Sequence, residues 1–347
     1  MMALTKIGTT GLALPAMGLG CGTLGDPDEV ISEAQAQATL QAAWDGGIRY
    51  FDTAPWYGNT KSEHRLGHFL RQQPRQEFTV TTKVGRVYFR PDDPAGFGHS
   101  PWMARWKGGL PFDLRFDYSR DGLLRSYEDS LMRLGLNRVD ALVIHDLDFR
   151  HQKTEEGVAR ALDVLENEGG YRLLRDLKEA GEIKAIGVGI NHDGMIKRFL
   201  ERFEIDYFLI AMPYTLLDQT AMDREFDLCA EHGAGVVIGA VFASGILAHG
   251  AGEGGRYAYQ PASAEIIERV RRMEAVCTRF GTALSTAALQ FPLAHPLVAS
   301  VIPGANSPGQ VAQNLDALSA SVPGELWIEL KSAGLLRSDA PVPAAAD

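Results

Sequence analysis

Eight short apolar runs alternate with helix-like segments along most of the 347-residue chain, and this alternation limits the possible folds more than any other feature. Each run is apolar throughout instead of alternating with polar residues, as expected for strands that are buried on both faces. Strands that each lead into a helix form a parallel sheet, and eight such units complete a closed barrel. The runs are residues 17–21, 50–52, 79–82, 141–144, 183–188, 207–211, 235–238 and 300–302.

The segments between the runs carry the ordinary signals for helix ends. Ser32 precedes the first segment, Gly46 follows it, Gly135 follows the third, and Pro308 begins the last. The segments are residues 33–45, 63–72, 120–134, 172–181, 193–203, 221–232, 264–289 and 308–320. We therefore predict an α/β protein with a (β/α)8 TIM barrel, in which residues 1–337 form a single domain.

Four further stretches do not fit the repeat. Residues 4–14 contain two short strand-like runs around a turn, and we expect a β-hairpin that precedes the barrel and closes its floor. Residues 86–118 and 243–262 each follow a strand, so we expect two long loops on the C-terminal face, where barrel active sites lie. Residues 338–347 are rich in Ala, Pro and Asp and are predicted to be a disordered tail.

The composition argues against several classes of partner. A formal net charge of −10 disfavours nucleic acid and anionic membranes, although local donors can still hold a phosphate-bearing cofactor. The longest apolar stretch, near residues 208–217, is too short to span a bilayer and contains Pro213. Three widely spaced cysteines and a start without an apolar signal segment favour a cytoplasmic protein. Nothing in the sequence indicates an oligomeric state.

Residues 20–25 match the pattern GxGxxG directly after a predicted strand, which taken alone suggests a Rossmann dinucleotide site. In such a site the motif opens a helix whose N-terminus receives the pyrophosphate. Here Asp26, Pro27 and Asp28 follow, the carboxylates would repel a pyrophosphate, and the next helix is predicted to start only near Ser32. We therefore expect a glycine-rich loop over the top of the barrel.

Four chemically useful side chains occur at or just beyond the ends of three predicted strands. Asp52 ends the second strand, Lys83 follows the third and His145 follows the fourth, while Tyr57 lies just beyond Asp52. Each residue alone has an ordinary structural explanation, as a cap, a core side chain or a loop residue. Because neighbouring strands of a barrel end at the same face, all four together predict one catalytic group in a cleft.

The chemistry of the four residues is coherent. An ammonium group near a tyrosine lowers the phenol pKa from about 10, and we expect Lys83 to act on Tyr57 in this way. Asp52 would hold the lysine in place. Tyr57 then donates a proton to a carbonyl oxygen during reduction, or accepts one from a hydroxyl during oxidation. A neutral His145 would orient the same oxygen by a hydrogen bond, and a nicotinamide would exchange the hydride.

With these residues in this order, the chain resembles the aldo-keto reductase superfamily. The matching segments are FDTAPWYG (51–58), TTKVG (81–85), VIH (143–145) and KAIGVGIN (184–191). Within the superfamily it resembles bacterial sugar 1-dehydrogenases of the D-threo-aldose (L-fucose) type and pyridoxal 4-dehydrogenases, through residues 108–148. The resemblance implies that Asp52, Tyr57, Lys83 and His145 are the catalytic tetrad.

The resemblance also implies where the cofactor binds. The family's Ser-Asn pair that holds the nicotinamide amide is incomplete, because only Asn191 is present and it fits with a shift of one residue. Ala211 and Gly239 replace a Gln and a stacking Tyr. The other implied cofactor-binding residues are Ser244, Gly245 and Leu247 for the pyrophosphate, and Gly304, Asn306, Gln310 and Asn314 for the adenosine end.

Family members that bind NADP carry a Lys and an Arg near Gly304 and Gln310, which bind the 2′-phosphate. This chain has no Lys or Arg between Gly304 and Leu330. An unpaired phosphate forfeits charge-assisted hydrogen bonds of about 1.5–3 kcal/mol each. We therefore predict NAD as the cofactor, with NADP disfavoured, and oxidation as the working direction.

Aromatic side chains near the tetrad are typical of a pocket for a sugar or pyridine ring. The predicted pocket residues are Trp56, Trp102, Trp106 and His192. The same aromatic residues would also pack the 86–118 loop onto the barrel, and His192 would also cap the following helix. The short stretch that contains His145, Asp146, Asp148 and His151 offers metal-ligand types, but the HxH of barrel metallohydrolases is absent after the first strand, so we expect no metal site.

The sequence thus predicts an NAD(P)-dependent aldo-keto oxidoreductase with a small-molecule sugar or aldehyde substrate. The first hypothesis is oxidation of the C1 hydroxyl of a cyclic, L-fucose-like aldose hemiacetal to a lactone. The alternatives are a pyridoxal 4-dehydrogenase, a general aldehyde reductase and, from another class, a cofactor-binding regulatory subunit of a membrane channel. The complete tetrad weighs against a purely regulatory role.

Overall fold

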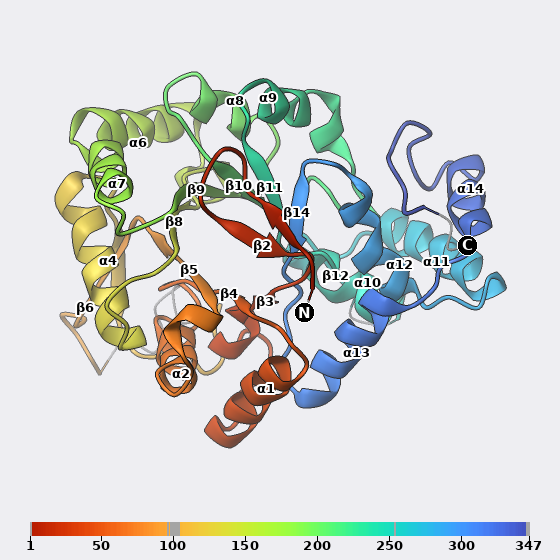
Figure 1. Ribbon diagram of the computed structural model, residues 1–347, viewed down its shortest axis with the longest axis horizontal. Coiled ribbons are helices and arrows are strands. Elements are labelled where there is room, and N and C mark those ends of the chain that lie inside the picture. Colours follow the sequence, from red (N-terminus) through yellow and green to blue (C-terminus); the bar gives the residue numbers. More distant parts are fainter. Residues whose placement is uncertain (1, 96, 98–104, 253–254, 345–347) are drawn as a thin grey trace.

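The computed structural model describes residues 2–95, 97, 105–252 and 255–344. Eight parallel strands form one sheet in the order β14–β11–β10–β9–β8–β5–β4–β3 (Figure 1). Bridges from Met17 to Val301 and from Gly20 to Gly304 join the two edges, so the sheet closes into the predicted barrel. The strands are β3 (Leu19–Gly20), β4 (Tyr50–Asp52), β5 (Thr79–Val84), β8 (Ala141–His145), β9 (Ala185–Ile190), β10 (Tyr207–Ile210), β11 (Gly235–Ile238) and β14 (Val298–Val301).

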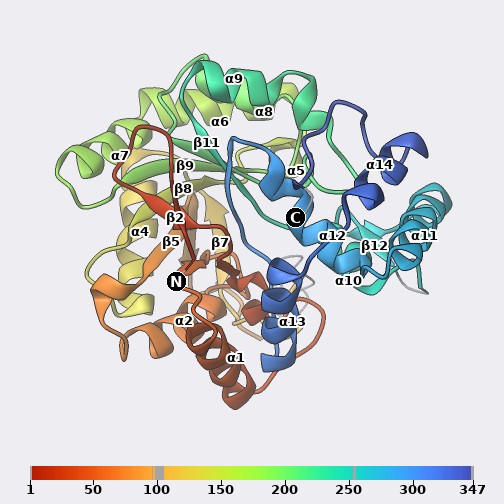
Figure 2. The same ribbon diagram turned by 45° about the vertical axis from the view of Figure 1, so that its right-hand side comes forward.

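Helices surround the barrel (Figures 1 and 2). Those in the predicted segments are α1 (Glu33–Asp45), α2 (Lys61–Leu70), α4 (Arg120–Leu134), α7 (Gly170–Glu179), α8 (Met195–Leu200), α9 (Glu225–Glu231), α11 (Ala264–Arg279), α12 (Leu284–Gln290) and α13 (Pro308–Ser319). Ser32 caps α1 by accepting a hydrogen bond from the Gln35 amide over 3.1 Å. The predicted 264–289 helix is two helices, because the chain turns at Gly281, where φ is +63°.

Two longer helices lie outside the predicted segments. They are α6 (Glu155–Asn167) and α14 (Gly324–Ser332), and two single turns, α5 (Phe149–Gln152) and α10 (Ile246–His249), were also not predicted. A barrel repeat needs only one helix between strands, so the second helix between β8 and β9 had no place in the pattern. Among the described residues, no helix combines the length and apolar character needed to cross a bilayer.

The interior of the barrel is filled with side chains. Tyr50, Val143 and Tyr207 pack there with Ile7 and Leu14 from the N-terminal segment. That segment forms the predicted hairpin, in which β1 (Leu4–Lys6) pairs antiparallel with β2 (Ala13–Pro15). The hairpin covers the floor of the barrel, so the opposite end is the one open to a ligand.

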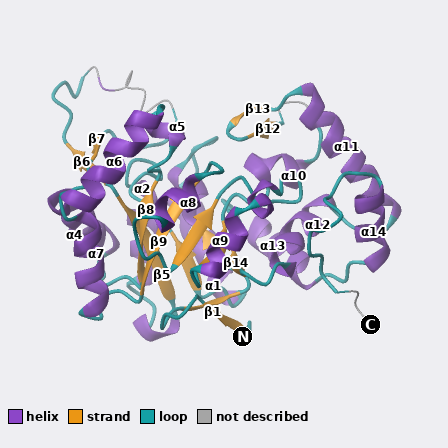
Figure 3. Ribbon diagram, turned by 90° about the horizontal axis from the view of Figure 1, so that it is seen from above, coloured by secondary structure: helices purple, strands orange, loops and turns teal. Residues whose placement is uncertain are grey.

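The two long segments after β5 and β11 lie at the end away from this hairpin (Figure 3). The predicted 86–118 loop is not a loop at its ends, where β6 (Arg86–Phe89) pairs antiparallel with β7 (Asp113–Phe116). A long insertion separates these strands, so no local signal marked their pairing. The 243–262 segment contains α10 and a small hairpin of β12 (Arg256–Tyr257) and β13 (Gln260–Pro261).

The C-terminal residues were predicted to be a disordered tail. Ala340 is 1% exposed, and Lys331 Nζ donates to the carbonyl oxygen of Ser338 over 3.0 Å. The chain therefore packs against the protein at least as far as Ala340, and residues 345–347 lie outside the described residues.

Candidate active site

The four predicted catalytic residues lie together at the C-terminal ends of three neighbouring strands. Asp52 ends β4, Lys83 lies in β5 opposite Val143, and His145 ends β8. Tyr57 follows in the loop after β4, and the centres of its ring and the His145 ring are 6.0 Å apart. Tyr57, Lys83 and His145 line one cavity, and Asp52 lies behind Lys83.

The ammonium group of Lys83 is held by two hydrogen bonds. Its Nζ donates to a carboxylate oxygen of Asp52 and, over 2.9 Å, to the carbonyl oxygen of Thr53. Thr81 donates to the second Asp52 oxygen over 2.7 Å. Both side chains of the ion pair are only 1% exposed, so removal of either would leave an uncompensated buried charge.

The surroundings of Tyr57 overturn one expectation. Lys83 Nζ lies 4.8 Å from the centre of the Tyr57 ring, but Asp52 offsets its charge. Burial of Tyr57 and the negative charge of Asp52 raise the pKa of the phenol well above its usual value of 10.0. The prediction that Lys83 lowers this pKa is therefore wrong, and Tyr57 holds its proton at neutral pH.

Glycines of the GxGxxG motif let the loop after β3 pack against the Tyr57 turn. A Cβ atom on Gly25 would lie 2.4 Å from the backbone nitrogen of Gly58, and one on Gly20 would lie 2.6 Å from the Ile302 carbonyl oxygen. No side chain fits at such distances, so these glycines serve close backbone approach. Residues 21–25 form a short 3-10 turn and α1 begins only at Glu33, which confirms that the motif is not a Rossmann site.

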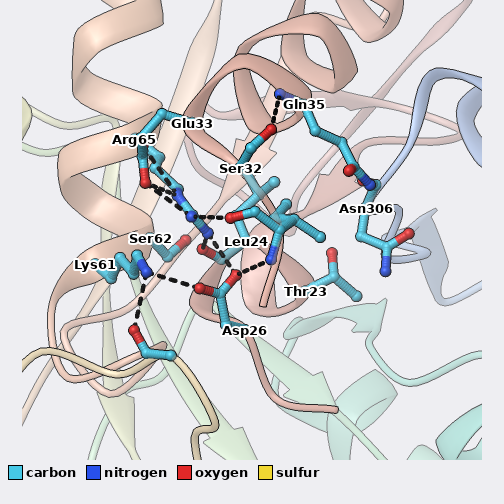
Figure 4. A network of polar contacts seen from close by, with 12 residues as sticks. Thr23, Leu24, Asp26, Ser32, Glu33, Gln35, Lys61, Ser62, Arg65 and Asn306 are labelled. Atoms are coloured by element: carbon cyan, nitrogen blue, oxygen red, sulfur yellow. Dashed lines mark hydrogen bonds and ion pairs between the residues drawn. The ribbon is translucent and has the colours of Figure 1, made fainter. Parts of the chain in front are cut away.

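Asp26 anchors the same loop to α2 (Figure 4). Its buried carboxylate accepts from Lys61 Nζ over 2.7 Å and from Arg65 Nη1 over 2.6 Å. Arg65 also donates to the Leu24 carbonyl oxygen over 2.7 Å. Because each charged group has hydrogen-bond partners, this network holds the loop firmly against the turn that carries Tyr57.

Arg86 holds His145 in one tautomer. Arg86 Nη1 lies 2.9 Å from His145 Nδ1, and because a guanidinium can only donate, Nδ1 must accept. Burial, followed by the positive charges of Arg86 and Lys83, lowers the pKa of His145 well below its usual value, so the ring is neutral and carries its proton on Nε2. Among the described residues this Nε2–H has no hydrogen-bond partner, the Asp146 carboxylate being 3.5 Å away.

Arg86 itself was not singled out by the sequence analysis. Its guanidinium lies between the rings of Trp56 and Phe116, 4.9 and 4.6 Å from their centres, and Nη2 donates to Asp146 over 2.7 Å. Burial alone would raise the pKa of the Asp146 carboxyl, but the Arg86 guanidinium holds it well below its usual range. The sequence signal that could have identified Arg86 is its position just after one strand end, beside the strand that ends in His145 and leads into Asp146.

Asn191 is fixed at the cavity wall by two carboxylates. Its Nδ2 donates to Asp146 over 2.9 Å and to Asp148 over 3.1 Å, and its backbone amide donates to Asp148 over 2.9 Å. These carboxylates are thus bonded to protein donors. Within the described residues, no group of three His, Cys, Asp or Glu side chains forms a candidate metal site.

The cavity at the barrel mouth has a volume of about 90 Å³. Of the predicted pocket residues, Trp56 and Trp106 line it, and the Trp106 ring lies 5.4 Å from that of Trp56 and 6.1 Å from that of Tyr57. His192 does not line it and is 44% exposed, and Trp102 lies outside the described residues. Lining residues that the sequence analysis did not single out are Arg105, Arg150 and Tyr259.

The segments predicted for the pyrophosphate and adenosine follow β11 and β14. Gln310 Oε1 accepts from the Asn306 amide over 2.9 Å, and Asn314 Nδ2 donates to Gly304 over 3.4 Å. Asn306 Nδ2 donates to Glu29 over 2.6 Å, so a carboxylate borders this segment. In the other segment, Ser244 and Gly245 have φ values of +65° and +100°, and Leu247 is buried.

The barrel and the group of polar residues at its open end define the class of protein. Residues 16–333 match the aldo/keto reductase family. The chain therefore belongs to this family, and it is an oxidoreductase that uses a nicotinamide cofactor.

Similar proteins agree with this assignment. The chain is 40% identical over 335 residues to a pyridoxal 4-dehydrogenase of Microbacterium luteolum, covering 95% of this chain and 97% of that protein. It is 38% identical over 332 residues to a D-threo-aldose 1-dehydrogenase of a Pseudomonas species, covering 94% and 96%. Among solved structures, the holo form of an aldo-keto reductase from Bacillus halodurans has the same fold, with a TM-score of 0.73 at 24% identity over 100% and 99% of the two chains.

Proposed function

We propose that the protein is an NAD-dependent dehydrogenase that oxidises the C1 hydroxyl of a cyclic aldose hemiacetal, such as that of L-fucose, to a lactone. The observation that carries this proposal is the edge-to-face contact of the Tyr57 ring with a neutral His145, whose Nε2–H has no hydrogen-bond partner among the residues that the structure describes. The 38% identity to a protein named D-threo-aldose 1-dehydrogenase supports the choice of C1 as the reacting carbon.

The residues of the cavity fit a nicotinamide ring. Gly189 and Ala211 present little or no side chain, and Leu209 offers an apolar surface to a flat ring. Asn191 lies beside them with its side chain already oriented. A Cβ on Gly189 would lie 3.6 Å from the His145 ring, so a larger residue would fill space next to the catalytic group.

In the proposed oxidation, the C1–H and O–H bonds of the hemiacetal break and the C1=O bond of the lactone forms. NAD, when bound, supplies the acceptor for the hydride that leaves C1. Tyr57, in its phenolate form, accepts the hydroxyl proton, and His145 Nε2–H donates to the same oxygen and orients it. Lys83 and Asp52 form a buried ion pair beneath these groups and keep the floor of the site fixed.

Pyridoxal is the second candidate substrate. The relative that is 40% identical to this chain is named pyridoxal 4-dehydrogenase, and the cyclic form of pyridoxal is also a hemiacetal. The rings of Trp56 and Trp106 would pack equally well against a pyridine ring or the apolar face of a sugar.

Assays of NADH formation with L-fucose, D-arabinose, L-galactose and pyridoxal distinguish the candidates, with simple aldehydes tested in the reverse direction. We expect turnover of at least one free sugar and release of its lactone. Turnover limited to pyridoxal would replace the first candidate with the second. Reduction of simple aldehydes alone would contradict both.

We also propose that the enzyme prefers NAD to NADP. No Lys or Arg lies between Gly304 and Leu330, and Glu29 places a carboxylate 2.6 Å from Asn306 Nδ2, where it would repel a 2′-phosphate. We expect kcat/KM to be at least about tenfold higher with NAD, as the loss of one charge-assisted bond requires.

The matched variants Gln310→Arg and Ala312→Arg test the cause of this preference. Gln310 borders the adenosine segment, whereas Ala312 is exposed on the same helix. Only Gln310→Arg should raise kcat/KM for NADP, by about tenfold. A wild-type preference for NADP, or equal gains in both variants, would contradict the proposal.

A further inference from the structure

Two arginines line the cavity without a carboxylate partner in the described part of the chain. Arg105 and Arg150 are both part of the cavity wall, together with Tyr57 and His145. Among the described residues, neither guanidinium takes part in an ion pair or donates a side-chain hydrogen bond; both instead face the ring of Tyr259, 5.8 and 3.9 Å from its centre. Arg86, in the same cavity region, is by contrast paired with Asp146.

Two of the nearby carboxylates, Asp146 and Asp148, already accept hydrogen bonds. Asp146 accepts from Arg86 and Asn191, and Asp148 accepts from Asn191 and from the backbone amide of Arg150. Burial lowers the pKa of Arg105, and the neighbouring Arg150 adds to this while Asp28 opposes it. Two partly buried positive charges thus lie against the same Tyr259 ring in a protein whose net charge is −10, an arrangement that a bound anion would stabilise.

An unused hydrogen-bond donor lies in the same wall. Trp106 is 3% exposed and lines the cavity, and its Nε1–H has no partner among the described residues. The Arg105 guanidinium lies 4.8 Å from the centre of the Trp106 ring. An indole N–H and two guanidinium groups together present only donors, which suits an oxygen-rich anion.

We propose that Arg105, Arg150 and Trp106 form a subsite for an anionic group on the substrate, a carboxylate or a phosphate, remote from the carbon on which Tyr57 acts. This inference rests on the proposed function and narrows its substrate class from neutral aldoses to aldoses that carry an acid group at the far end. A hexuronic acid and a hexose 6-phosphate are the two sources of such a group.

Both arginines come from the side of the barrel that carries the catalytic residues. They follow β5 and β8, the strands that supply Lys83 and His145. The segments predicted for pyrophosphate and adenosine follow β11 and β14, and β9 and β10 separate these strands from β8 in the barrel. The Tyr259 ring that both arginines face belongs to the segment after β11, and its backbone amide donates to Ser244 over 2.9 Å, so the cofactor pyrophosphate is the competing source of the anion.

A graded series of sugars tests the proposal. L-Fucose, L-galactose, L-galacturonate and L-galactose 6-phosphate differ only in the group on C5, which is a methyl, a hydroxymethyl, a carboxylate or a phosphorylated hydroxymethyl group. We expect kcat/KM for at least one anionic sugar to exceed that for L-galactose by about tenfold or more, because charge-assisted hydrogen bonds are strong. The anionic sugar with the higher kcat/KM identifies whether the acid group is a carboxylate or a phosphate.

Variants assign the effect to the subsite. Arg105→Met and Arg150→Met should each abolish most of the preference for the anionic sugar, Arg150→Lys should retain part of it, and Arg115→Met, an exposed arginine on β7, should leave it unchanged. Equal kcat/KM for neutral and anionic sugars in the wild type would overturn the proposal. A rise in KM for NAD with an unchanged sugar preference would also overturn it, since the arginines would then bind the cofactor.

Binding measured without turnover separates this inference from the proposed function. Methyl L-galactosiduronate has a blocked C1 and is not oxidised, but it keeps the carboxylate. Calorimetry with the NAD-bound enzyme should show about tenfold tighter binding of this compound than of methyl L-galactoside, and Arg150→Met should remove the difference. If no sugar is oxidised but this difference is found, the subsite stands and the reaction is wrong; equal binding would refute the subsite.

Discussion

Tyr57→Phe is expected to lower kcat by about a thousandfold while leaving the Kd for NAD within about threefold of the wild-type value, because general acid–base catalysis typically contributes factors of this size. The phenylalanine ring can keep the edge contacts with His145 and Trp106, whose centres lie 6.0 and 6.1 Å away, so only the hydroxyl is lost. Steady-state kinetics and fluorescence titration with NAD provide the two measurements.

A matched control is Tyr127→Phe, which removes the hydroxyl of another buried tyrosine outside the cavity. This variant should retain turnover.

The pH dependence adds a second check on Tyr57. Burial and Asp52 raise the pKa of Tyr57, so the fraction of Tyr57 in the phenolate form increases as pH rises above neutral. The kcat/KM for oxidation should therefore increase from neutral into alkaline pH. Turnover that survives in Tyr57→Phe, or an oxidation rate that falls over this pH range, would exclude Tyr57 as the base.

Arg86→Met is expected to lower kcat/KM by about a hundredfold, since the loss of one preorganised group at a reacting oxygen has this magnitude. The guanidinium fixes the His145 tautomer over 2.9 Å and pairs with Asp146 over 2.7 Å. Arg86 also lowers the pKa of His145, so its removal raises that pKa, and activity should then be lost as pH falls through the new value. Kinetics from acidic to neutral pH measure this shift.

The buried carboxylate of Asp146 requires a control for Arg86→Met. Breaking a buried ion pair destabilises a protein by about 3–5 kcal/mol, so the single variant should also have a lower melting temperature. The double variant Arg86→Met/Asp146→Asn removes the unpaired charge and should recover stability without recovering the wild-type pH profile. If the double variant has wild-type kinetics, Arg86 acts only as a structural counter-ion and does not position His145.

Much of this site was predictable because three of its residues lie at the ends of predicted strands. Asp52, Lys83 and His145 end three neighbouring strands, and the strand register alone brings them together. The contacts of Arg86 and Tyr259 were not predictable, because they depend on where the long segments after β5 and β11 fold. The β6–β7 pairing was missed for the same reason, since a long insertion separates its strands.

The electrostatics were less predictable than the fold. The presence of Lys83 near Tyr57 suggested a lowered phenol pKa, but the direction depends on what else contacts the ammonium group. Asp52 and the Thr53 carbonyl oxygen accept hydrogen bonds from the Lys83 ammonium group, which lies near the face of the Tyr57 ring. Burial of the phenol therefore decides the direction of its pKa shift. Sequence order can place such groups near one another, but it does not give their relative burial.

Transfer of deuterium from C1 of the substrate to the nicotinamide is the most direct test of the proposed reaction. The sugar with the highest kcat/KM is prepared with deuterium at C1 and oxidised by the wild-type enzyme with NAD, and both products are analysed by mass spectrometry. The proposed function predicts one deuterium atom in each NADH formed, together with the corresponding lactone. NADH that lacks deuterium, or a sugar product that is not the lactone, would contradict it.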